Sequence, residues 1–116
     1  MGTLVAVQGC SLEWTVTGGS VVEGEIVTVP SLNSFVESKG IYYGDLTVIG
    51  VLSGNAPVNL IISPSGGVVK VNGESVVLKG DGSVTINWSG TTGSPPPSGT
   101  VSVKISDAGQ SSLFVG

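Results

Sequence analysis

A β-hairpin centred on Asn72-Gly73 constrains the fold more than any other feature of this sequence. A type I′ turn requires positive φ at both central positions, and Asn followed by Gly tolerates that conformation. β-Prone residues flank the pair, and the turn would place Val71 opposite Glu74 and Val69 opposite Val76. The chain is therefore expected to form two antiparallel strands here.

Alternation along this hairpin predicts two different faces. One face is expected to hold Val69, Val71, Val76 and Leu78. The other face is expected to hold Lys70, Ser75 and Lys79, together with Val68 and Val77.

The rest of the chain reads as a succession of short strands joined by turns. Period-two alternation and β-prone runs predict strands at 3–8, 12–17, 21–29, 46–52, 58–63, 83–89, 100–106 and 111–115. Gly24 is expected to mark a bulge or a point of close approach within its strand. Residues 90–99 are expected to form a loop. The fold class is therefore predicted to be all-β, built from short hairpins, and the chain is predicted to be one domain, 1–116.

Residues 31–43 allow two interpretations. Leu32, Phe35 and Val36 have helical spacing behind Ser31, which is a suitable N-cap, so a short helix is one possibility. The segment also resembles the central hairpin, since both units begin Pro-Ser and end Gly-Asp, with the Gly-Asp pairs 36 positions apart. An internal repeat of this kind favours a second hairpin.

Two Gly-Asp pairs complete the predicted turn motif. Asp45 follows Gly44 and Asp81 follows Gly80, and both carboxylates are expected to cap turns through Asx-type hydrogen bonds. The structural turn motif therefore consists of Asn72, Gly73, Gly44, Asp45, Gly80 and Asp81.

Composition argues against an enzyme and against a nucleic-acid-binding protein. The chain has no His and no Arg, so it lacks the commonest general base, the commonest metal ligand and the bidentate anion clamp. A net charge of −4 gives little electrostatic support for nucleic-acid binding. Cys10 is the only cysteine and is expected to be a small packed residue, while Glu23 and Glu25 are expected on one face of a strand.

Low charge also points to a covered surface. Only 10% of the residues are charged and the mean hydropathy is +0.45, which is unusual for a monomer that relies on a charged surface for solubility. The start of the chain lacks a basic n-region, so no secretory signal is expected. A partner is therefore expected to cover part of the molecule.

The two repeated units resemble the repeats of the PAAR-domain family, whose members sharpen the tips of contractile injection machines. The similarity lies in Ser63-Pro64, in 69–73 and 76–81, more loosely in 30–36 and 41–46, and in the opening residues 5–9. The resemblance implies a small cone of β-hairpins that caps a trimeric β-helical spike, one copy per trimer, in a phage tail baseplate or a type VI-like secretion system. It also implies a mechanical role in piercing the target envelope, and a location in the virion or with the secreted apparatus.

The chain departs from this family in one respect. Many members hold zinc at the apex with His and Cys, and this chain has no His, so no cofactor is expected. Docking residues are expected among exposed strand positions, with Val69, Val71, Val76 and Leu78 as the candidates. The alternative function is a β-sandwich module for virion decoration or adhesion, in which the loop 90–99 would bind the ligand.

Overall fold

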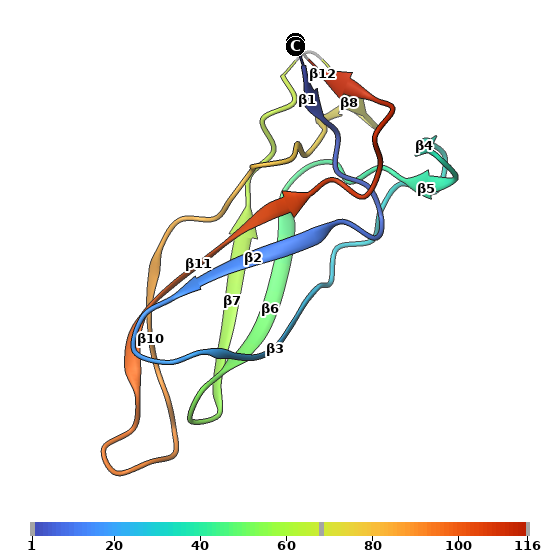
Figure 1. Cartoon of the computed structure of the whole chain (residues 1–116). Coiled ribbons are helices and arrows are strands. Elements are labelled where there is room, and N and C mark those ends of the chain that lie inside the picture. Colours follow the sequence, from blue (N-terminus) through green and yellow to red (C-terminus); the bar gives the residue numbers. More distant parts are fainter. Residues whose placement is uncertain (1, 68, 116) are drawn as a thin grey trace.

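The computed structural model describes residues 2–67 and 69–115, and Val68 lies outside the described residues (Figure 1). The described residues form strands and no helix, so the all-β prediction is confirmed. The strands are β1 (Thr3–Leu4), β2 (Ser11–Val16), β3 (Val21–Ile26), β4 (Phe35–Val36), β5 (Lys39–Gly40), β6 (Leu46–Leu52), β7 (Ala56–Ile62), β8 (Lys70–Val71), β9 (Glu74–Ser75), β10 (Ile86–Ser89), β11 (Ser98–Asp107) and β12 (Phe114–Val115). Within the described parts of the chain, no helix is long and apolar enough to cross a membrane.

The molecule is elongated, with extents of 48 × 26 × 23 Å. Three short strand pairs, β1–β12, β4–β5 and β8–β9, lie toward one end, which we call the hairpin end (Figure 1). The long strands run toward the opposite end, where loops 17–20, 53–55 and 90–97 connect them (Figure 1). We call this opposite end the loop end.

Two antiparallel sheets form the long part of the molecule. Their strand orders are β10-β11-β2 and β3-β6-β7. The inward side chains of these sheets make the larger core, which includes Leu46, Val48, Leu60, Trp88 and Val103. Because each buried aliphatic side chain contributes roughly 1.5–3 kcal/mol, this core is the main source of stability in the long part.

Hairpins rather than a helix form both repeated units. In the first unit β4 pairs with β5 through Glu37 and Ser38, whose φ angles are 53° and 67°. In the second unit Asn72 and Gly73 have φ angles of 51° and 85°, and Val71 pairs with Glu74. The predicted type I′ turn and the hairpin interpretation of 31–43 are therefore confirmed.

Several predicted boundaries are wrong by a few residues. The strand predicted at 21–29 ends at Ile26, and the strand predicted at 58–63 begins at Ala56 and includes Pro57. Pro57 is tolerated because β7 is an edge strand and a proline there removes no required ladder bond. The loop predicted at 90–99 is shorter, because β11 already begins at Ser98.

Candidate docking interface

Three chain segments meet at the hairpin end in a closed cycle of backbone hydrogen bonds. The Ala6 N–H donates to the Val77 carbonyl at 2.7 Å, the Val77 N–H to the Tyr42 carbonyl at 3.1 Å, and the Tyr42 N–H to the Ala6 carbonyl at 3.1 Å. Each segment both donates once and accepts once, so the three positions are equivalent. This arrangement is a pseudo-threefold axis within one chain.

A second cycle joins the same segments, with donors two residues after the first-cycle positions and acceptors two residues before them. The Gln8 N–H donates to Gly40 O at 2.8 Å, the Gly44 N–H to Ser75 O at 2.9 Å, and the Lys79 N–H to Leu4 O at 2.8 Å. Isolated β-bridges join the same segments in the same cyclic pattern: Val5 with Leu78, Val7 with Ile41, and Tyr43 with Val76. The pseudo-threefold relation therefore covers several residues of each segment.

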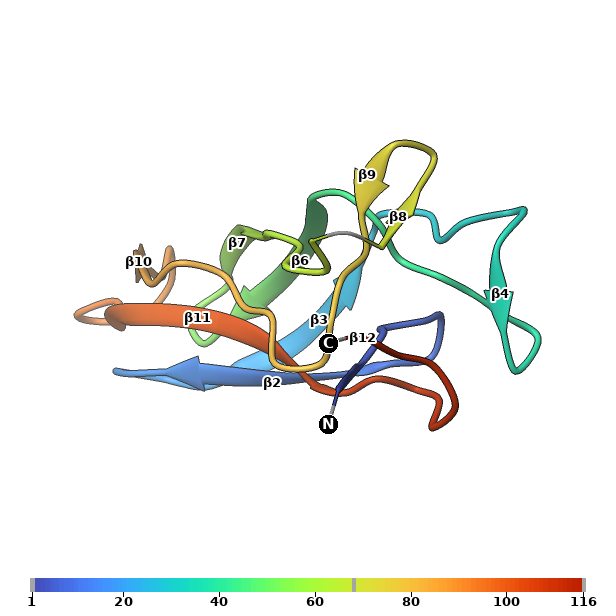
Figure 2. The same ribbon diagram turned by 90° about the horizontal axis from the view of Figure 1, so that it is seen from above.

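Alternation within the three segments divides their side chains between two cores. The middle residues Ala6, Tyr42 and Val77 belong to the larger core of the long sheets. A second core at the hairpin end is built from residues that flank these middle positions, together with Val71 of β8: Val5, Val7, Ile41, Val71, Val76 and Leu78. The ring is thus packed on both sides, which fixes the three hairpins relative to each other. Figure 2 shows these hairpins pointing in different directions about this end of the molecule.

The third hairpin is assembled from the two ends of the chain. Its strands β1 and β12 pair through Thr3 with Val115 and Leu4 with Phe114. In the first two hairpins a backbone N–H closes the base, from Ser31 to Ile41 O at 2.8 Å and from Gly66 to Val76 O at 2.9 Å. In the third hairpin the buried side chain of Gln110 takes this role, donating from Nε2 to Val5 O at 2.8 Å.

The oxygen of the same Gln110 amide orders the chain before β12. Its Oε1 accepts from the Ser112 N–H at 2.6 Å and from the Leu113 N–H at 2.8 Å. Sequence reasoning missed this residue, because nothing in the local sequence marks it. A signal for the third unit did exist: the apolar triplet 5–7 stands 36 positions before the triplet 41–43.

A carboxylate links the first hairpin to the third. Glu37 Oε2 accepts from the Ser112 hydroxyl at 2.6 Å and from the Ser111 N–H at 2.9 Å. These hydrogen bonds, foremost that of the Ser112 hydroxyl, lower the pKa of Glu37 below its ordinary value of 4.5. On the same hairpin, Lys39 Nζ donates to the carbonyl of Gly109 at 2.7 Å.

The predicted docking side chains are not at the surface. Val69, Val71, Val76 and Leu78 do share one face, as predicted, because all four pack in or against the second core. Val71, Val76 and Leu78 are buried and Val69 is half-buried, so these side chains hold the hairpin end together. The expectation that they form the docking surface is therefore wrong. Val77, predicted on the opposite face, is buried in the larger core.

The two Gly-Asp pairs play different roles. The Asp81 carboxylate accepts from the Leu78 N–H at 2.8 Å and from the Ser65 N–H at 3.0 Å, so it caps the turn as predicted. Among the described residues, the exposed carboxylate of Asp45 has no hydrogen-bond partner, so the prediction that it caps a turn is wrong. The hydrogen-bond cycles also align Gly44 with Lys79 rather than with Gly80, so the repeat is offset by one residue at this point.

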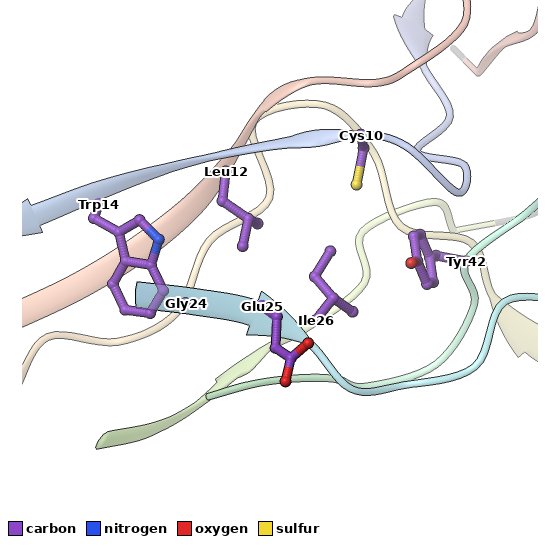
Figure 3. A pocket seen from close by; sticks show the side chains of 7 residues that line it. All are labelled: Cys10, Leu12, Trp14, Gly24, Glu25, Ile26 and Tyr42. Atoms are coloured by element: carbon purple, nitrogen blue, oxygen red, sulfur yellow. The ribbon is translucent and has the colours of Figure 1, made fainter. Parts of the chain in front are cut away.

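A pocket of about 390 Å³ opens between β2 and β3, the two edge strands that face each other without pairing (Figure 3). Trp14 covers one side of this pocket, and Glu25 projects at its rim (Figure 3). Gly24 and Gly50 allow the indole to approach, because a Cβ on either residue would lie 2.5 or 2.9 Å from the Trp14 ring. Gly24 is therefore a close-approach point, while the bulge of β3 lies between Val21 and Glu23.

Cys10 and Tyr42 line the same pocket. Burial raises the pKa of the Cys10 thiol to about 11, so the thiol is protonated at neutral pH and is a poor nucleophile. Burial also raises the pKa of Tyr42. Cys10 packs against the larger core, in agreement with its prediction as a packed residue.

The residues present do not fit the zinc site that the family resemblance implies. The chain has no His, and within 2–67 and 69–115 no three Cys, Asp or Glu side chains gather in a group that could hold a metal ion. Glu23 and Glu25 lie on one face of β3, opposite Val51 and Ile49, which confirms the prediction for that pair.

Comparison with known proteins adds no relative to this description: no protein-family model, no curated protein and no solved structure matches the chain.

Proposed function

We propose that this chain is a structural protein that caps the trimeric β-helical spike of a contractile tail, with one copy on each trimer. In this role it has no enzymatic activity and no cofactor, and it forms the part of a phage baseplate or a type VI-like apparatus that meets the target envelope first. The sequence resemblance to PAAR repeats at residues 63–81 and 30–46 supports the proposal.

The observation that carries the proposal is the pseudo-threefold axis. A single chain that caps a trimer must offer the same contact to each of three identical subunits, because symmetric assemblies repeat their contacts. The cycle through Ala6, Tyr42 and Val77 places three equivalent segments around one axis. An internal threefold arrangement of this kind matches the end of a trimer.

The packing of the hairpin end supports a mechanical role. Backbone hydrogen bonds and a core of Val, Ile and Leu side chains hold the three hairpins, and long flexible side chains contribute little to this core. Dense packing of this kind resists deformation. A part that transmits force along a spike needs that resistance.

Co-purification tests this function. The chain is mixed with the trimeric spike protein from its own gene cluster, and the mixture is separated by size exclusion. We expect the chain to elute with the spike. If the two proteins elute separately at micromolar concentrations, the capping function is wrong.

A second candidate function rests on the two three-stranded sheets of the long part. These sheets and the exposed loop 90–97 are also what a β-sandwich decoration or adhesion module would present. Replacing Pro95 and Pro96 by Gly separates the candidates. An adhesion module would lose its ligand, whereas spike binding would persist if the loop faces away from the spike.

A further inference from the structure

We infer that the loop end is the leading end of the tip, which contacts the lipid bilayer, and that the hairpin end rests on the spike. This inference depends on the proposed function and adds the direction in which the chain is mounted. The distribution of charge, the hydrogen bonds at the loop end and the different symmetry of the two ends support it.

Charged side chains are distributed unevenly along the molecule. Of the four Lys and eight acidic residues, eight lie on the short hairpins or where the long strands join them: Glu37, Lys39, Asp45, Lys70, Glu74, Lys79, Asp81 and Asp107. The segments 14–22, 46–69 and 82–103, which contain all three loops of the loop end, have no charged residue. The charged groups nearest to these loops along the chain are Glu23 and Lys104.

A charge-free end is suited to entering a bilayer. Moving a charged side chain into hydrocarbon is far more costly than moving an uncharged polar one. Uncharged loops of Ser, Thr, Asn, Gly and Pro therefore meet a lower barrier than the hairpin end, where charges from several segments lie close together.

The three loops are also tied to each other by hydrogen bonds. The Ser53 N–H donates to the Ser20 carbonyl at 2.9 Å, which joins the first loop to the second. The Thr91 and Thr92 N–H groups donate to the Gly54 carbonyl at 2.8 and 3.0 Å, which joins the second loop to the third.

The connection between the first loop and β11, the strand that follows the third loop, completes the cycle. The Thr17 N–H donates to the Thr100 carbonyl at 2.9 Å, and the Thr100 N–H donates to Thr17 Oγ1 at 2.8 Å. Trp88 Nε1 donates to the Thr17 carbonyl at 3.1 Å from inside the core. Backbone groups that already have partners lose less when water is removed, which is the condition in a bilayer. Hydrogen bonds thus join the three loops and β11 into one connected end.

Symmetry distinguishes the two ends. At the hairpin end the hydrogen-bond cycles repeat three times with the same spacing. At the loop end the connecting loops 17–20, 53–55 and 90–97 differ in length, and β2 and β3 do not pair whereas β6 and β7 do. Only the hairpin end can therefore make three similar contacts with a trimer.

Cysteine accessibility in the complex tests this direction. Cys10 is the only cysteine, so Cys10→Ser provides a background for three single-cysteine variants: Ser38→Cys and Glu74→Cys at the hairpin end, and Thr92→Cys at the loop end. All three positions are exposed in the free chain. Each variant is bound to the trimeric spike from the same gene cluster, and its reaction rate with a polyethylene glycol maleimide is measured with and without the spike.

We expect the spike to slow modification at positions 38 and 74 by about tenfold or more and to change the rate at position 92 by less than about twofold, since interface burial excludes a bulky reagent. The opposite pattern, with position 92 protected, overturns this inference and leaves the capping function intact. If the parent chain itself forms no complex, the proposed function fails, and that outcome is visible before any labelling.

Force spectroscopy tests the contact with lipid. The spike with its tip is attached by the spike base to a cantilever and pushed through a supported bilayer of dioleoylphosphatidylcholine. Thr92→Lys should raise the breakthrough force by about half or more, because a charge then has to enter hydrocarbon, while the matched control Thr92→Ser should leave it unchanged. Equal forces for Thr92→Lys and Thr92→Ser would overturn the assignment of the loop end as the leading end.

Discussion

Individual residues at the hairpin end act mainly through backbone geometry and local hydrogen bonds. Asn72 and Gly73 adopt the left-handed conformation that the turn between β8 and β9 requires. Gln110 replaces a backbone donor at the base of the third hairpin. The turn could be predicted from the sequence, because its chemistry is local, whereas the role of Gln110 depends on Val5, which lies 105 positions away.

Replacing Gly73 by Ala tests the turn. The residue has a φ of 85°, and a side chain in the left-handed region costs about 1–2 kcal/mol. We expect the free energy of unfolding, measured by urea denaturation, to fall by about that amount. A Cβ on Gly73 would meet no atom within 4 Å, so no steric clash adds to this cost. A loss of stability well above about 2 kcal/mol would therefore contradict the backbone conformation as its cause.

Glu37 should make stability depend on pH. Its folded-state pKa is lowered by the bonds to Ser112 and Ser111, so the carboxylate stabilises the fold above its ordinary pKa of 4.5, and this contribution is lost as the pH falls through the lower folded-state value. Glu37→Gln should therefore lower the melting temperature at pH 7, and the difference from the parent should shrink below pH 4.5. A difference that stays constant down to pH 2 would contradict this role.

The strands and hairpins show which elements the sequence can predict. The strand at 46–52 and the hairpin at 70–75 were predictable because β-prone runs and turn residues are local signals. The hairpin at 35–40 was favoured only by its similarity to the later unit, since its local spacing also allowed a helix. The β1–β12 hairpin was not, since its strands come from opposite ends of the chain with no turn between them. Alternation identified the shared face of Val71, Val76 and Leu78 but could not reveal that two further segments cover it.

The Trp14 ring packs directly against Gly24 and Gly50 of the neighbouring sheet, which leaves no room for a side chain at either glycine. A Cβ on Gly24 would lie 2.5 Å from the indole, so Gly24→Ala should lower the free energy of unfolding by about 1–3 kcal/mol through overpacking. In a Trp14→Leu background the same change should cost less, because the ring no longer fills the space. Urea denaturation of the four proteins measures this coupling, and strictly additive effects would contradict the contact.

At the scale of the whole molecule, the two ends differ in symmetry and in charge. The hairpin end repeats its hydrogen bonds three times and has most of the charged side chains. The three loops of the loop end contain no charged residue, differ in length, and are tied by hydrogen bonds to each other and to β11. The resemblance of two repeats to a known family implied the capping role, and the low charge indicated a covered surface. The third unit and the direction of mounting require the arrangement in space.

Native mass spectrometry of the complex with the trimeric spike is the most direct measurement of the central claim, that one chain presents a threefold-repeated surface. The account predicts a single species with one copy of this chain for three spike chains, because the three equivalent segments occupy all three subunits together. A complex with three copies per trimer would show that each subunit binds its own chain, and the pseudo-threefold axis would then have no part in docking.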